Sequence, residues 1–124
     1  MSKIKISVEG INLLAELNDT VTAKAIIEAL PFDGSANTWG DEIYFGIPVS
    51  VFQESDARAE VEVGELGYWP VGKAFCIFFG PTPASSDEKP VAASPVNIIG
   101  RVTGDVLQLK AVKDGAVVNV ESAE

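Results

Sequence analysis

The segment from Gly67 to Pro83, which reads GYWPVGKAFCIFFGPTP, is the decisive stretch of this sequence. Its centre, residues 74–79, is apolar at every position, which is typical of a strand buried on both faces. A Tyr-Trp-Pro turn precedes this strand and a Gly-Pro-Thr-Pro segment follows it. Because proline cannot donate a hydrogen bond to a sheet, Pro81 ends the strand. The stretch therefore predicts a β protein in which this strand is enclosed.

The rest of the chain consists mainly of short segments in which apolar and polar residues alternate, the pattern of a half-buried strand. Residues 64–67 are expected to form a turn, and residues 87–93 an exposed loop. A single short helix is expected over residues 20–30, begun by Asn18 or Asp19 and ended by Pro31. Many short strands with frequent Gly and Pro favour an all-β barrel or sandwich, with one domain over residues 1–124. The expected strands are residues 3–8, 11–17, 34–39, 43–45, 59–63, 74–79, 96–102, 105–109 and 116–120.

Length and charge limit the classes of partner. The 124 residues are 47% hydrophobic, enough for one core, and carry a net charge of -9. That charge disfavours nucleic acids and anionic membranes, while a cationic partner remains open. No apolar run approaches the roughly 20 residues of a membrane-spanning helix, and the N-terminus alternates rather than forming a signal sequence. We expect a cytoplasmic protein, and the oligomeric state stays open.

The scarcity of metal-binding and nucleophilic side chains excludes several chemistries. The chain has no histidine and a single cysteine, Cys76, which rules out the usual zinc sites and both Ser-His-Asp and Cys-His catalysis. An all-oxygen site for Mg²⁺ or Ca²⁺ is formally open, but no loop has the spacing of such a site. We expect no metal and no cofactor. Cys76, placed mid-strand among bulky apolar residues, is expected to be buried and inert.

Four blocks occur in order along the chain and carry a resemblance to a known family. They are GDEIYF at residues 40–45, VGELGYWP at 63–70, FFGPTP at 78–83 and NIIGRV at 97–102. Together they resemble the small prokaryotic cyclophilin-like proteins, a family of uncharacterised function, over nearly the whole chain. The resemblance implies a closed antiparallel β-barrel of about eight strands with one or two short helices.

Cyclophilins themselves are peptidyl-prolyl isomerases, and this chain resembles them only in part. Residues 75–79 are similar to their phenylalanine-rich central strand, and residues 98–102 to their apolar-apolar-Gly-Lys-Val strand. The Phe-His-Arg and Phe-x-x-Gln-Gly-Gly-Asp blocks of the isomerases are absent. No isomerase residue therefore has a counterpart here, and fold alone does not imply the activity.

Six residues are candidates for a ligand-binding site, and each has a simpler structural explanation. Adjacent strand residues point to opposite faces, so of the polar residues in the first block only Glu42 and Tyr44 can lie on the same face. There they could carry out acid-base chemistry. The alternative is a turn with a solvated carboxylate. Arg101 could hold a carboxylate or polarise a carbonyl with its planar fork, or pair with a neighbouring glutamate on the surface.

The remaining candidates lie at the two ends of the decisive stretch. Tyr68 and Trp69, with Trp39, could floor a pocket and offer an indole N–H donor, or cap the core as large apolar rings. Thr82, held between two prolines, could contact a ligand through its hydroxyl, or simply stiffen a loop. The candidate ligand-binding set is thus Glu42, Tyr44, Tyr68, Trp69, Thr82 and Arg101.

Three classes of function remain open. The first is a binding module for a small molecule or peptide, without efficient prolyl isomerase activity. The second is an enzyme, either a weak or divergent prolyl isomerase or one that uses a Glu and Arg pair; isomerisation needs only a shaped groove and a donor to the amide. The third is a regulatory partner protein that binds a basic protein through the acidic segment 53–65, for which a solvated face is the alternative.

Overall fold

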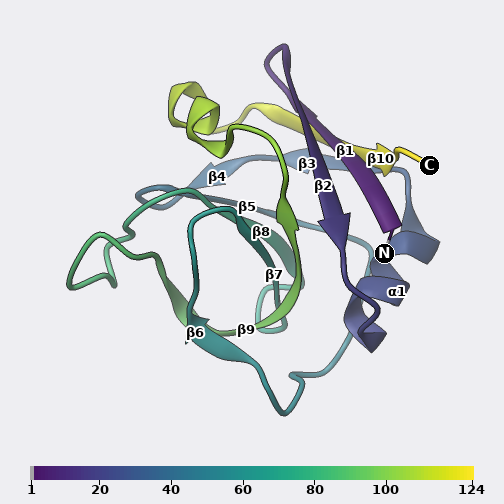
Figure 1. Cartoon of the computed structure of the whole chain (residues 1–124), viewed down its shortest axis with the longest axis horizontal. Helices are drawn as coiled ribbons and strands as arrows, with labels where there is room; N and C mark the ends of the chain where they lie inside the picture. The colour runs from purple at the N-terminus through teal and green to yellow at the C-terminus, as the bar shows by residue number, and fades with distance from the viewer. Residues whose placement is uncertain (1) are drawn as a thin grey trace.

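The computed structural model describes residues 2–124 of the chain. This part of the chain forms a curled antiparallel sheet of ten strands with one α-helix and one 3-10 helix (Figure 1). The helices are α1 (Val21–Ala29) and η1 (Val106–Ala111). The strands are β1 (Ser2–Val8), β2 (Ile11–Leu17), β3 (Phe32–Ser35), β4 (Asn37–Thr38), β5 (Glu42–Gly46), β6 (Arg58–Glu60), β7 (Glu65–Trp69), β8 (Ala74–Phe78), β9 (Val91–Val102) and β10 (Val117–Ser122).

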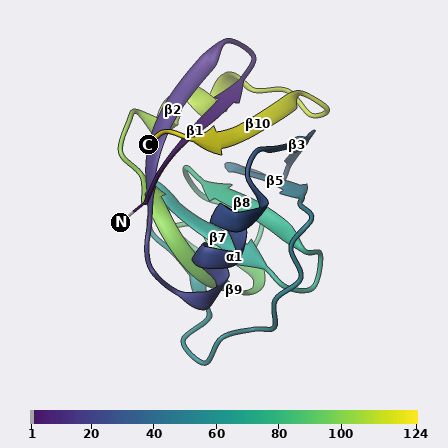
Figure 2. The same cartoon turned by 90° about the vertical axis from the view of Figure 1, so that its right-hand side faces the viewer.

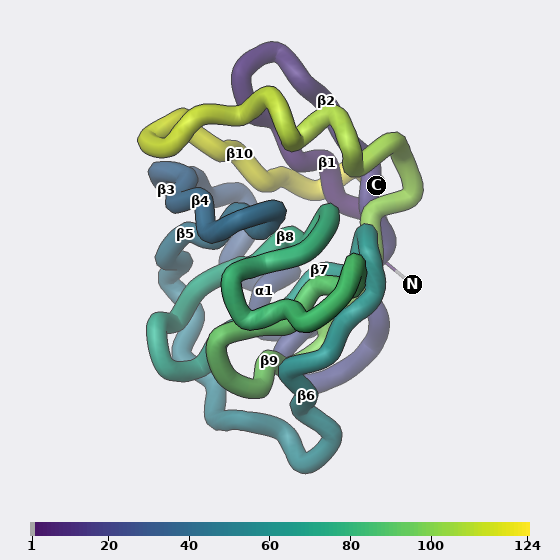
Figure 3. Tube along the Cα trace, turned by 90° about the vertical axis from the view of Figure 1, so that its left-hand side faces the viewer, coloured from purple at the N-terminus to yellow at the C-terminus, as the bar shows by residue number. Residues whose placement is uncertain are grey.

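The order of the strands confirms a mainly antiparallel β fold but does not confirm the expected closed barrel of about eight strands. Neighbours follow the order β3-β10-β1-β2-β9-β7-β8-β5-β4, and β6 pairs with β9 outside this path. The two ends, β3 and β4, are separated in sequence only by Ala36. The first half of this segment bonds to β10 and the second half to β5 (Figure 3). Within residues 2–124 the sheet therefore has ten strands rather than about eight. No pairing between β3 and β4 is present in this part of the chain, so hydrogen bonds do not close the ladder, and only the chain itself links its two ends at Ala36.

Most predicted strands are confirmed, and the exceptions have local causes. The strand predicted over residues 105–109 is wrong: these residues belong largely to η1, whose first turn is capped by Asp105 accepting a bond from the Leu107 N–H at 3.1 Å. The turn predicted at residues 64–67 is mostly strand β7, which pairs with both β8 and β9. The pairing of β7 on both sides overrides the turn tendency of its glycine.

Helix α1 lies against β9 (Figure 2). Its N-cap is Thr20, not Asn18 or Asp19, since the Thr20 hydroxyl accepts a bond from the Ala23 N–H at 3.2 Å. Asn18 instead supports the cap by accepting the Thr20 hydroxyl at 2.7 Å. Ala23 and Ile26 bury the apolar face of the helix in the main core. No helix within residues 2–124 has the length and apolar character needed to cross a membrane.

The decisive strand β8 separates two apolar clusters, which confirms that it is buried on both faces. Phe75 and Ile77 belong to the large main core inside the curl of the sheet. The opposite face of β8 contributes to a smaller group, here called the outer cluster, which consists of Val61, Ala74, Cys76, Phe78, Ala92 and Val96. Cys76 is 1% exposed, as predicted.

A buried polar network holds the segment between β5 and β6 against α1 and β9. Asn97 of β9 is fully buried; its amide donates to the Thr22 hydroxyl and to the Phe52 carbonyl, each at 3.0 Å, and its carbonyl accepts the Glu54 N–H at 2.8 Å. The Glu54 carboxylate accepts bonds from the backbone N–H and the hydroxyl of Thr22. Glu54 is thus a structural acceptor rather than part of a solvated acidic face.

Candidate functional site

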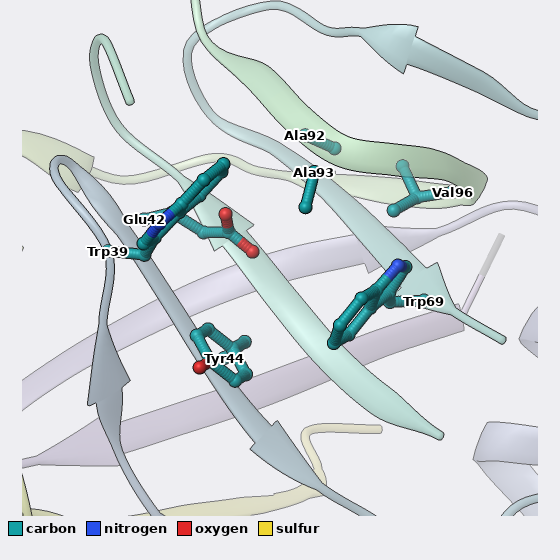
Figure 4. A pocket seen from close by; sticks show the side chains of 7 residues that line it. All are labelled: Trp39, Glu42, Tyr44, Trp69, Ala92, Ala93 and Val96. Carbon is teal, nitrogen blue, oxygen red and sulfur yellow. The ribbon is translucent and has the colours of Figure 1, made fainter. Parts of the chain in front are cut away.

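The outer face of the sheet carries a pocket beside the outer cluster. We call it the outer pocket; its volume is about 200 Å³. Three aromatic rings and one carboxyl group line one part of it, and small apolar side chains of β9 line the other (Figure 4). The lining residues are Trp39, Glu42, Tyr44, Trp69, Ala92, Ala93 and Val96.

Strand β5 places Glu42 and Tyr44 in the pocket because strand side chains alternate between faces. Ile43 and Phe45 point the other way, into the main core. In the pairing of β5 with β8, Glu42 lies opposite Phe78 and Tyr44 opposite Cys76. The pocket therefore has the outer cluster beside it, and the shared face predicted for Glu42 and Tyr44 is the face that lines it.

Trp39 reaches the pocket from a tight turn that the Gly-Pro-Thr-Pro segment fixes in place. The Trp39 N–H donates to the Glu42 carbonyl at 2.9 Å. The N–H of Asp41 donates to the carbonyl of Pro81, and the N–H of Phe79 donates to the carbonyl of Asp41, both at 2.9 Å. A Cβ at Gly80 would fall 2.3 Å from the Asp41 carboxylate, so the close contact between these two segments requires glycine there.

Trp69, at the end of β7, is held by three contacts. Its indole N–H donates to the Ser94 hydroxyl. The ring meets Tyr44 edge to face, with centroids 6.1 Å apart and planes at 77°. A Cβ at Gly72 would lie 2.7 Å from two ring carbons, so the absence of a side chain there leaves the space that the indole occupies. The ring is thus positioned before any ligand arrives.

Glu42 is the unusual group of the site. Its residue is only 5% exposed, and its carboxyl lies among the rings of Trp39, Tyr44 and Trp69 (Figure 4). Burial raises the pKa of Glu42 from 4.5 to about 7. A hydrogen bond with the Cys76 thiol acts to lower this pKa, but the effect of burial is larger. Burial also raises the pKa of Cys76, and the charge of Glu42 adds to that effect. Near neutral pH the carboxyl can therefore either donate a proton or carry a charge.

The structure places the other predicted site residues elsewhere. Tyr68 is fully buried in the main core, where its hydroxyl donates to the Val49 carbonyl at 2.7 Å. The hydroxyl of Thr82 donates to the Val91 carbonyl and accepts the Ala84 N–H, so it braces the loop before β9. Both side chains serve the scaffold of the pocket rather than its lining.

Arg101 lies on the exposed surface, apart from the outer pocket. It is paired in register with Glu16 of β2 and Glu65 of β7, and these three residues line a separate depression. Glu65 itself makes a two-bond ion pair with Arg58, at 2.9 and 3.0 Å. Burial acts to raise the pKa of Glu65, but its bonds to Arg58 and to the Glu62 N–H outweigh this and lower it. The Glu and Arg pair suggested by the sequence is thus not formed by Glu42.

The contribution of β9 to the pocket was missed in the sequence. Residues 87–93 were expected as an exposed loop, yet β9 begins at Val91, and Ala92 and Ala93 line the pocket. The apolar run of residues 91–93 is the signal that could have revealed it. Trp39 was considered only as a companion of Tyr68 and Trp69, since nothing in the sequence shows that its turn folds back over β5.

A profile of the cyclophilin-like family matches residues 2–121, and the chain belongs to that family. It is also similar to a hypothetical protein from Archaeoglobus fulgidus whose structure was determined in solution. The two share 44% sequence identity, with a TM-score of 0.83 over 98% of this chain and 95% of the other. No curated protein matches the sequence.

Proposed function

We propose that this protein is a binding module that takes a small molecule or a short peptide segment in the outer pocket. The observation that carries the proposal is the buried carboxyl of Glu42 among three positioned aromatic rings. Ligand sites are concave and mostly apolar, with a few polar groups that fix orientation, and the outer pocket has this composition. At about 200 Å³ it suits one compact chemical group rather than a whole drug-sized molecule.

The alternative, a weak prolyl isomerase, has less support. An isomerase needs a donor directed at the amide in the transition state. The chain has only two arginines, and neither lines the outer pocket: Arg58 pairs with Glu65, and Arg101 lies in the separate depression. The donors that remain in the pocket are neutral groups: a protonated Glu42, the Tyr44 hydroxyl and the indole N–H of Trp39. A protease-coupled prolyl assay at high protein concentration is therefore expected to give the uncatalysed rate.

The binding proposal is tested by nuclear magnetic resonance. Xaa-Pro peptides and a library of small metabolites are added to labelled protein, and the indole N–H signals of Trp39 and Trp69 and the amide signal of Tyr44 are followed. At least one compound is expected to move these three signals and leave that of Arg101 in place. The proposal fails if no compound moves them, or if shifts gather around Arg101 instead.

A further inference from the structure

The outer pocket combines two features that together select a kind of ligand. One is a carboxyl group on a residue that is 5% exposed, and the other is a set of three aromatic side chains around it. Aromatic faces attract cations through their negative π clouds, and the attraction grows where water is excluded. A carboxylate in the same enclosure adds a full negative charge.

Within residues 2–124, no cationic side chain lines the pocket around Glu42. The nearest acidic neighbour in sequence, Asp41, has its own partner in Lys110, at 3.7 Å. Elsewhere in the chain, the partly buried carboxylate of Glu65 is paired with a cation, the guanidinium of Arg58. Glu42 is thus left uncompensated inside an aromatic enclosure.

A ligand that covers the pocket would remove the remaining water from Glu42. A neutral apolar group would leave an ionised carboxylate without any partner, which is costly. A group that carries a positive charge would compensate the carboxylate and face the aromatic rings at the same time. The net charge of -9 favours the approach of such a ligand as well.

We propose that the outer pocket binds a compact organic cation, a substituted ammonium group, with Glu42 as counter-ion and Trp39, Tyr44 and Trp69 as the aromatic walls. This rests on the proposed binding function and specifies its ligand class. A free small molecule and a modified lysine side chain both carry such an ammonium group and present the same chemistry to a pocket of this size.

Matched probes separate charge from shape. Choline and its neutral isostere 3,3-dimethylbutan-1-ol (here dimethylbutanol), in which carbon replaces nitrogen, are titrated at about pH 8. At that pH Glu42 is mostly ionised, because its pKa is about 7. Binding is followed through the indole signals of Trp39 and Trp69, with sodium chloride added to the dimethylbutanol samples to match ionic strength. Choline is expected to bind about tenfold more tightly or better. Equal binding of the two probes, or tighter binding of dimethylbutanol, overturns the inference.

A variant pair tests the role of the carboxylate. Glu42→Gln keeps the shape of the side chain and removes its charge, and Glu28→Gln removes the same charge from the exposed face of α1, away from the pocket. Glu42→Gln is expected to show a much smaller preference for choline, since only the aromatic rings remain to attract the cation. It is expected still to bind dimethylbutanol, which shows that the pocket is intact. Glu28→Gln is expected to keep the preference. Retention of the full preference by Glu42→Gln contradicts the assignment of the counter-ion.

The source of the cation is resolved by one further comparison. A short peptide that contains trimethyllysine is titrated beside choline and beside the same peptide with norleucine. Tighter binding of the trimethyllysine peptide than of choline points to a side chain, and tighter binding of choline points to a free small molecule; both support the inference. If peptides or metabolites move the pocket signals but no cation does, the inference fails while the binding function stands. If nothing binds, both fail.

Discussion

Replacing Glu42 by glutamine removes a carboxyl group that, because of its burial, stays mostly protonated up to about pH 7 in the folded protein. In the unfolded chain its pKa is the ordinary 4.5, and in the folded protein it is about 7. Below pH 4.5 the carboxyl is protonated in both states. As the pH rises from 4.5 towards 7, the unfolded chain loses this proton while the folded protein holds it, so the stability of the folded protein falls. Above about pH 7 the loss is complete.

The size of the loss follows from the two pKa values. Each pKa unit corresponds to about 1.36 kcal/mol, so a rise from 4.5 to about 7 corresponds to roughly 3 kcal/mol. The titratable side chains that face Glu42 are Tyr44 on β5 and Cys76 on β8, while β9 presents Ala92, Ala93 and Val96. We therefore assign this pH dependence to Glu42 alone over the acidic to neutral range.

The assay is urea denaturation of the wild type and of Glu42→Gln between about pH 4 and pH 8.5. The free energy of unfolding of the variant minus that of the wild type is expected to increase by about 3 kcal/mol across this range. Groups common to both proteins, including Glu65, cancel in the difference. A flat curve for Glu42→Gln would refute the reasoning, because it would mean that Glu42 ionises alike in both states.

Three other expectations concern the scaffold of the pocket. Gly80→Ala should destabilise the fold by about 1–3 kcal/mol and perturb the signals of Trp39, because its Cβ would overlap Asp41; thermal denaturation and spectra of the indoles test this. Asn97→Ala should lower the free energy of unfolding by about 1–3 kcal/mol, since the partners of the Asn97 side chain lose their hydrogen bonds. It should also speed the hydrogen exchange of the Glu54 amide proton, and an unchanged exchange rate would argue against the network. Cys76 should resist an aromatic disulfide reagent in the native protein and react once urea unfolds it, because burial raises its pKa; rapid native labelling would contradict this.

The sequence predicted the general architecture because its strongest signals are local. The all-apolar strand, the prolines that end it and the alternating segments all depend on neighbours within a few residues, and the structure confirms a mainly β fold built on them. Four sequence blocks, of which Tyr-Trp-Pro and Phe-Phe-Gly-Pro-Thr-Pro are the most specific parts, together indicated the family whose profile matches the chain. The strand expected at residues 105–109 failed because a capped 3-10 turn can share an apolar pattern with a short strand.

The candidate site was only partly visible in the sequence. Glu42, Tyr44 and Trp69 meet in the outer pocket, while Tyr68 turns into the main core and Arg101 lies in another depression. Tyr68 and Trp69 are neighbours in sequence, and strand alternation requires that they face opposite sides. Which of the two faces inward depends on how β7 sits between β8 and β9, and no local pattern contains that information.

Burial of residues 74–79 could be inferred from the sequence because every position in that run is apolar. That Glu42 and Tyr44 share a face could also be inferred, because side-chain alternation is a property of the strand alone. Which face points into the core depends on the tertiary structure. It placed Phe75 and Ile77 in the main core, set Cys76 and Phe78 in the outer cluster, and folded the turn of Trp39 back over β5. The raised pKa of Glu42 belongs to this second level, since it arises from the burial that distant segments produce together.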